Sequence, residues 1–240
     1  CSSLTEINIP STVVYIDGDA FGACWGVTSF NVAEGNATFS SIDGVLFNVD
    51  KYELRLYPIG KTDESYTVPA GVKDIMGDAF YGAGNLKQLI MPEGVSRVYA
   101  QAIREMGNLE TIDFPSTLTE LNTGTFYGCK KLKTIIIRAT EVPYYGGTDL
   151  SSSSFDNTVL YVPEASLEAY KADSDFGALA ANGRNNIKSI GVLTGIDNIA
   201  SEDAIEVARY DITGRQLKSA AKGINIVKYS DGSIKKVLVK

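Results

Sequence analysis

Apolar residues recur at a fixed spacing of 23 positions through the middle of the chain. Leu86, Leu109 and Leu132 start three successive rows, each 23 residues after the last. In most rows the apolar positions first alternate with polar ones, a proline follows, and an aromatic or aliphatic residue comes near the end. The row from Leu109 has its later apolar positions at Ile112, Phe114, Leu118, Leu121, Phe126 and Cys129. The row from Leu4 keeps the same pattern, so the sequence predicts an array of similar units.

Each row predicts one short strand followed by a turn. Alternation at the start of the row places its apolar side chains on one face of a strand. The proline that follows ends the strand, because it cannot donate a hydrogen bond to a neighbouring strand. Burying six side chains contributes roughly 9–18 kcal/mol per row, whereas ordering the row costs on the order of 1–2 kcal/mol for each residue. A single row is therefore unstable alone, and the rows must stack into a solenoid of the leucine-rich type.

Two positions in each strand point away from this core. They are the second and fourth residues after the leucine that starts the row, and solenoids commonly bind partners through such a face. We expect a partner-binding face made of Gln88, Ile90, Thr111, Asp113, Thr134 and Ile136. Ile90 and Ile136 would be exposed on either side of Asp113, and exposed apolar residues can mark a partner site. The alternative is that the two isoleucines pack beneath a neighbouring loop.

The regular spacing is interrupted once. Pro10 and Pro69 occupy the same place in their rows but are 59 residues apart, which is not a multiple of 23. Two short apolar runs around a turn, at 45–47 and 54–57, predict a β-hairpin. We therefore expect an insertion at about residues 34–62.

The end of the chain departs from the repeat. We expect a helical cap on the array at about residues 158–190, where a proline suits the first helical turn. A linker is expected at residues 191–204. Residues 205–240 alternate between apolar and polar positions around turns at 213–214 and 231–232, which predicts a small unit of three or four antiparallel strands.

Three stretches of the array resemble the BspA-type leucine-rich repeats of bacterial surface proteins. They are CSSLTEINIPSTVVYIDGDAFGAC, YTVPAGVKDIMGDAFYGAGNL and IDFPSTLTELNTGTFYGCKKL. The resemblance covers roughly residues 1–190. It implies a mainly β, right-handed solenoid with a curved parallel sheet. It also implies adhesion to host proteins or to other cells.

The last segment is similar to the C-terminal sorting domain of type IX (Por) secretion substrates. The similarity rests on YDITGR, KGINIVK and KKVLVK. Asn225 replaces the tyrosine of the family pattern, and the segment is shorter than the family norm. The resemblance implies a location outside the cell or on the outer-membrane surface of a Gram-negative bacterium. A relic that extends the solenoid is the equal alternative.

The cysteines fit the repeat. Cys1, Cys24 and Cys129 occupy one row position, three residues after the aromatic position, as small buried fillers. Cys24 and Cys129 lie several strand spacings of about 4.8 Å apart, too far for a disulfide. Cys1 indicates that the chain starts inside a repeat, as the C-terminal part of a longer array. The alternative is a lipoprotein in which Cys1 is acylated.

Composition argues against most catalytic and nucleic-acid-binding functions. The net charge of −7 disfavours a nucleic-acid binder. The chain has no histidine, which removes histidine-assisted nucleophiles and the usual zinc sites. No apolar run approaches the roughly 20 residues that span a bilayer. We expect no enzyme activity, cofactor or metal.

We therefore expect a non-catalytic surface protein whose repeat face binds a host extracellular protein or another bacterial surface protein. One alternative is a glycan-binding module for nutrient capture, in which Tyr144 and Tyr145 could stack on a sugar. The other is a structural spacer without a ligand of its own.

Overall fold

The computed structural model describes residues 3–147, 149–181, 183–191, 206–211, 215–229 and 234–239. They divide into two compact units, residues 1–189 and residues 190–240. Cys1 and the expected linker, apart from Gly191, lie outside the described residues, as do both expected turns of the C-terminal unit.

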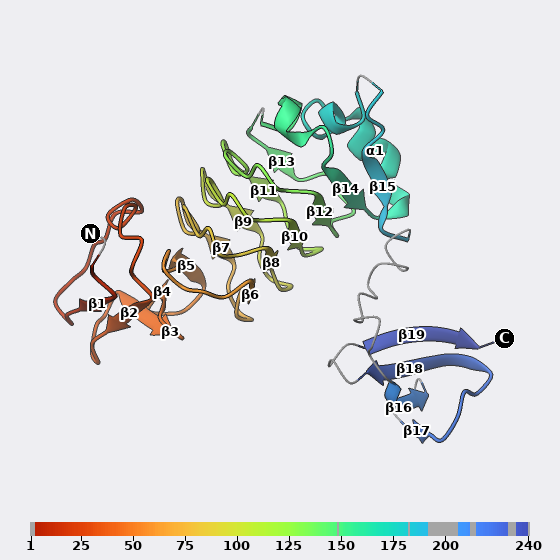
Figure 1. The fold of residues 1–240 in the computed structure, drawn as a ribbon, viewed down its shortest axis with the longest axis horizontal. Helices are drawn as coiled ribbons and strands as arrows, with labels where there is room; N and C mark the ends of the chain where they lie inside the picture. The colour runs from red at the N-terminus through yellow and green to blue at the C-terminus, as the bar shows by residue number, and fades with distance from the viewer. Residues whose placement is uncertain are drawn as a thin grey trace. The chain divides into compact units, whose positions relative to one another are not determined.

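The first unit confirms the mainly β repeat fold. Each regular row contributes one strand to each of two sheets, and Figure 1 shows these rows stacked from β6 to β14. One sheet has six parallel strands in the order β15-β14-β12-β10-β8-β6. Its strands are β6 (Ser65–Thr67), β8 (Gln88–Ile90), β10 (Thr111–Phe114), β12 (Thr134–Ile137), β14 (Val159–Val162) and β15 (Ile187–Ser189).

The second sheet has seven strands in the order β13-β11-β9-β7-β5-β4-β3. Its strands are β3 (Phe39–Ile42), β4 (Val45–Asn48), β5 (Glu53–Leu56), β7 (Asp74–Ile75), β9 (Arg97–Val98), β11 (Glu120–Leu121) and β13 (Tyr144–Tyr145). Strands β3, β4 and β5 pair antiparallel, whereas β5 to β13 are parallel. The two runs that predicted a hairpin are β4 and β5, and β5 joins the row strands as the next member of their sheet.

The N-terminal rows form a separate small sheet. Strands β1 (Glu6–Ile9) and β2 (Ser29–Val32) pair parallel in the 23-residue register and hydrogen-bond to neither large sheet as strands. They cover their own apolar cluster, whose buried members are Ile9, Cys24, Val27, Phe30, Phe39, Leu46 and Leu56. The main cluster runs from Val45 to Ile187. Strand β4 contributes to both clusters, so the hairpin lies between two cores.

The aromatic position of each row fills the space between the two sheets. Phe80, Ile103 and Phe126 are fully buried, and the ring of Phe126 lies 6.2 Å from that of Phe114. The array ends in short helices rather than in another regular row. They are η1 (Asp149–Ser151), η2 (Ser153–Phe155), η3 (Glu164–Ser166), α1 (Leu167–Ala172) and η4 (Phe176–Leu179). Tyr170 of α1 is fully buried, so this segment covers the last apolar layer.

Charge alternates from row to row along two columns of equivalent positions, which we call ladders. The alternating residues are Glu64, Lys87, Glu110 and Lys133 on one ladder and Asp74, Arg97 and Glu120 on the other. Nζ of Lys87 lies 2.6 Å from Oε1 of Glu64, and Nζ of Lys133 lies 2.9 Å from Oε2 of Glu110. Lys133 lowers the pKa of Glu110, whereas Glu64 raises the pKa of Lys87. The lysine pairs are solvent-exposed, so each contributes little on its own.

The second unit is a four-stranded antiparallel sheet in the order β17-β16-β18-β19. Its strands are β16 (Glu206–Asp211), β17 (Gln216–Leu217), β18 (Gly223–Tyr229) and β19 (Ile234–Val239). Asn225 is buried, donates a hydrogen bond to the carbonyl of Ala221 and accepts one from its N–H. The amide thus holds the start of β18.

Candidate partner-binding face

Two columns of side chains cross the outer face of the six-stranded sheet. They follow from the strand register, which joins residues of successive rows directly. The first column contains Ser65, Gln88, Thr111, Thr134 and Val159, and the second contains Thr67, Ile90, Asp113, Ile136, Tyr161 and Lys188. The columns are polar and exposed at β6 and become apolar towards β14. We call these two columns the sheet face.

The sequence placed six residues on the sheet face, and the structure brings all six onto neighbouring strands. Gln88 is exposed, and Ile90, Thr111, Asp113 and Thr134 are half-buried. The expected exposure of Ile136 is wrong, because this side chain is only 7% exposed. Its register partners on the neighbouring strands are Asp113 and Tyr161.

The carboxylate of Asp113 is bound by an arginine that follows strand β12. Nε and Nη2 of Arg138 donate to the two carboxylate oxygens of Asp113, at 2.9 and 2.7 Å. Arg138 stands where earlier rows have proline, and the sequence alone suggested only that the array ends there. A two-point arginine–carboxylate pair is planar and directional, and it neutralises the charge at the centre of the sheet face.

Tyr161 is one of the members of the sheet face that the predicted set of six did not include. It is 8% exposed and pairs with Ile136 on one side and Lys188 on the other. The sequence contains a signal for Tyr161, because its segment LYVP repeats the pattern of a strand followed by proline. The altered row length after Arg138 hid that register.

A polar cluster on β1 and β2 satisfies its own hydrogen bonds. Asn31 donates to Glu6 and to Asn8, while Ser29 donates to Asn31. These are the outward positions of the first two strands, and their groups already have partners. They are less suited than the sheet face to bind an outside ligand.

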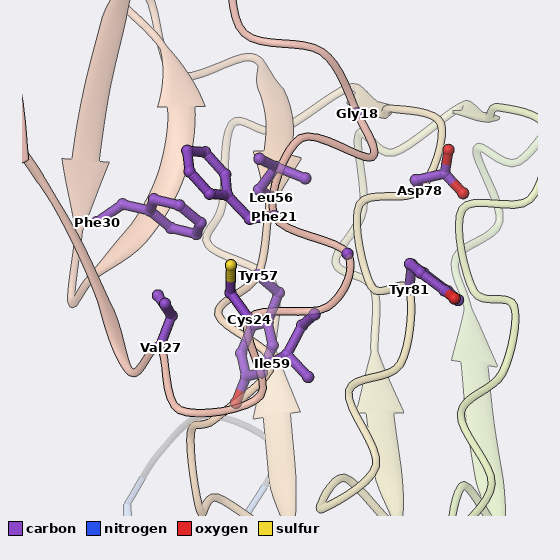
Figure 2. A pocket seen from close by; sticks show the side chains of 11 residues that line it. Gly18, Phe21, Cys24, Val27, Phe30, Leu56, Tyr57, Ile59, Asp78 and Tyr81 are labelled. Atoms are coloured by element: carbon purple, nitrogen blue, oxygen red, sulfur yellow. The ribbon is translucent and has the colours of Figure 1, made fainter. Parts of the chain in front are cut away.

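An apolar cavity lies between the N-terminal core and the main array. Figure 2 shows Phe21, Cys24 and Phe30 approaching Tyr57 and Ile59 around it. Its volume is about 20 Å³, which is room for roughly one water molecule. The cavity is therefore a packing gap and is too small for an organic ligand.

The two tyrosines expected to stack on a sugar differ in exposure. Tyr144 is exposed, but Tyr145 is buried and its hydroxyl donates to Oδ2 of Asp149 at 3.1 Å. Burial raises the pKa of the Tyr145 hydroxyl. Burial likewise raises the pKa of the nearby Cys129 thiol to about 12, so this cysteine is an inert filler. Tyr145 belongs to the core, which rules it out as a sugar platform.

Comparison with known families identifies the repeat. The model of the BspA type leucine-rich repeat region matches in six copies over residues 1–51 and 61–169. The chain belongs to the BspA-type leucine-rich repeat family. Leucine-rich repeat proteins are typically non-catalytic and bind other proteins, so the family suggests a protein-binding or adhesion-type role.

Several solved structures share this fold. A leucine-rich repeat protein from Eubacterium ventriosum is 28% identical over 69% of this chain and 44% of its own, with a TM-score of 0.58. A leucine rich cell surface protein from Faecalibacterium prausnitzii is 28% identical over 78% of this chain and 48% of its own, also with a TM-score of 0.58. The pneumococcal vaccine antigen PcpA also shares the fold. It is 24% identical over 78% of this chain and 56% of its own, with a TM-score of 0.53. This chain spans about half the length of these structures.

No curated protein matches this BspA-type chain. Within the part of the chain that the structure describes, every helix is too short or too polar to cross a membrane.

Proposed function

We propose that this chain is a non-catalytic, exported cell-surface protein that binds a protein partner through the sheet face. The partner is an extracellular host protein or another bacterial surface protein. The observation that carries the proposal is the composition of the sheet face. Exposed polar residues lie at its β6 end, half-buried Ile90 and Thr111 lie at its centre, and the central carboxylate of Asp113 is paired.

This distribution matches the composition of protein–protein interfaces. Their centres are depleted of unpaired charges, and polar residues form a rim around them. The Asp113–Arg138 pair offers a fixed, planar group to a partner without the cost of stripping water from a lone carboxylate. One structure with the same fold is named a leucine rich cell surface protein, which supports a location outside the cell.

A substitution at the centre of the sheet face tests the proposal. Ile90→Asp places a charge beside Asp113 at a half-buried position, so we expect binding to fall by at least about tenfold. The chain would be applied to an array of purified extracellular host proteins and bacterial surface proteins, and hits would be quantified by surface plasmon resonance. Val14→Asp is the matched control, because Val14 is an exposed apolar residue of the first row.

The outcomes separate the candidate sites. The sheet face is supported as the binding site if Ile90→Asp loses binding, Val14→Asp keeps it, and the melting temperatures of both variants equal that of the unaltered chain. Binding that survives Ile90→Asp contradicts it. Absence of any protein hit favours the spacer alternative. Ile136 is avoided in this experiment because a charge at a buried position would unfold the array.

We also propose that the C-terminal unit directs export through type IX secretion, which would place the protein on a Gram-negative outer membrane. The motifs at residues 210–215, 222–228 and 235–240 support this proposal, together with the antiparallel sheet that they form in part. A reporter fused to residues 205–240 should reach the surface of a bacterium with this system. Removal of residues 235–240 should retain the reporter inside, and equal export without them would contradict the proposal.

A further inference from the structure

Tyr127 is an exposed aromatic residue that stands between two hollows. It follows the buried Phe126, and its own side chain is 62% exposed. One hollow, of about 470 Å³, is lined by Tyr127 together with Glu105, Lys130 and Asp149. The other, of about 420 Å³, is lined by Tyr127 together with Gln101, Arg104 and Asp149. Both volumes lie within the range of roughly 300–1,000 Å³ that is typical of small-molecule sites.

The hollows are bordered by two residues with strained backbones. Gln101 has φ of 60° and Glu105 has φ of 58°, in the left-handed region that side chains disfavour. The next row has Gly124 and Gly128 at the same two positions, also with positive φ. The fold therefore requires left-handed turns here, and glycine would meet that requirement without strain.

The glycines of the next row leave room for these two side chains. A Cβ atom on Gly124 would lie 3.2 Å from Cγ of Gln101, and one on Gly128 would lie 2.6 Å from Cδ of Glu105. Each strained residue thus extends over a glycine and places a polar group in one of the two hollows. Asp78 has the same conformation one row before Gln101, with φ of 59°, so the turn belongs to the repeat. What is specific to this place is the polar side chain that extends over each glycine.

The polar groups around Tyr127 have capacity to bind a ligand. Both hydrogen bonds that Asp149 accepts, from the Phe126 N–H and the Tyr145 hydroxyl, go to Oδ2. Oδ1 accepts none from the described residues. Within that same part of the chain, Glu105 forms no ion pair. Two carboxylates and one amide therefore surround an exposed aromatic ring. Lys130 and Arg104 also line the hollows, and Nε of Arg104 already donates to Oδ1 of Asp78 at 2.7 Å.

We infer that Tyr127 is the platform of a binding site for neutral glycans. The C–H groups on one face of a pyranose ring carry partial positive charge and pack on the negative face of an aromatic ring. The hydroxyl groups at the edge of the sugar would donate to Glu105, Asp149 and Gln101. Because Asp78 neutralises Arg104, two carboxylates stand against one lysine, and this balance disfavours sialylated or sulfated glycans. The site lies on the row turns and is independent of the sheet face.

The test measures binding of defined sugars to the whole chain. Neutral tetrasaccharides built from glucose, galactose, mannose or N-acetylglucosamine would be titrated to about 10 mM by isothermal calorimetry, with sialyllactose as the acidic arm. We expect at least one neutral sugar to bind, and Tyr127→Ala to weaken it at least about tenfold. Tyr127→Phe should retain binding, because the ring remains. Tyr15→Ala, at a tyrosine that is 70% exposed in the first row, is the matched control and should bind as the unaltered chain does.

A second variant separates binding from folding. Glu105→Gly introduces the residue that Gly82 and Gly128 supply at the same turn in neighbouring rows. We expect it to weaken sugar binding while leaving the melting temperature unchanged or raised, because the backbone strain is relieved. A lower melting temperature with full binding would show that Glu105 serves packing only, and would overturn its role here.

Three further results would overturn the inference. They are no binding of any neutral tetrasaccharide, binding of the acidic sugar alone, and binding that survives Tyr127→Ala. Loss of sugar binding leaves the proposed function intact if Ile90→Asp still abolishes a protein hit, so the two proposals fail separately.

Discussion

At the scale of single residues, burial decides what each aromatic side chain does. Phe126 and Tyr127 are adjacent in the sequence, yet the first is fully buried and the second is largely exposed. The 23-residue period identifies the first, because the same position is apolar in every regular row. The period cannot identify the second, because exposure at that position depends on the neighbouring side chains.

The adjacent pair gives a stability prediction with its own control. Phe126→Ala should lower the free energy of unfolding by about 3–5 kcal/mol, because it leaves a cavity beside Phe114 and Tyr145. Tyr127→Ala should change the same quantity by less than about 0.5 kcal/mol. Urea denaturation followed by circular dichroism measures both. Similar losses in the two variants would contradict the assigned packing.

Individual residues also show why the sheet face was only partly predictable. The register of β8, β10 and β12 follows from the spacing, so the positions of Ile90, Asp113 and Ile136 on one face were predictable. The burial of Ile136 was not, because it depends on Tyr161 in a row of different length. The Asp113–Arg138 pair was likewise hidden, since Arg138 lies beyond the end of its strand.

At the scale of elements, the hairpin determines how the N-terminal rows attach to the rest. The sequence predicted β4 and β5 from alternation around a turn, and the strands pair as expected. It did not predict that β5 would continue the second sheet or that β1 and β2 would form a sheet of their own. Those outcomes depend on contacts between segments of different spacing, which no single period describes.

Gly60 provides a test of this attachment. A Cβ atom there would lie 2.7 Å from the carbonyl carbon of Gly26 and 2.8 Å from the carbonyl oxygen of Val27. Gly60→Ala should therefore push the segment at Gly26 and Val27 away from Gly60 and lower the free energy of unfolding by about 1–3 kcal/mol. Gly107→Ala is the matched control, because nothing lies within 4 Å of its Cβ position. Differential scanning calorimetry would record both variants, and equal melting temperatures would contradict the close approach.

At the scale of the repeat unit as a whole, the chain has two cores of unequal size. The N-terminal cluster is the smaller, and its strands form a two-stranded sheet. The main cluster extends through the regular rows to the helical cap. Local stability follows the number of buried apolar contacts, so the two parts should open with different free energies.

Hydrogen exchange would reveal this difference. The amide groups of β1 and β2 should exchange at least about tenfold faster than those of β10 and β12, because fewer buried side chains resist their opening. Mass spectrometry of peptides after timed exposure to heavy water measures the rates. Uniform protection across these four strands would indicate one cooperative core instead of two.

The alternation of charge between rows has a consequence for how such an array changes in length during evolution. Removing one row, residues 87–109, would place Glu110 beside Glu64 and Glu120 beside Asp74, so like charges would face each other along both ladders. Removing two rows, residues 87–132, would place Lys133 beside Glu64 and restore the attraction. A change in length that keeps opposite charges adjacent on the Glu64–Lys133 ladder therefore spans 46 residues rather than 23.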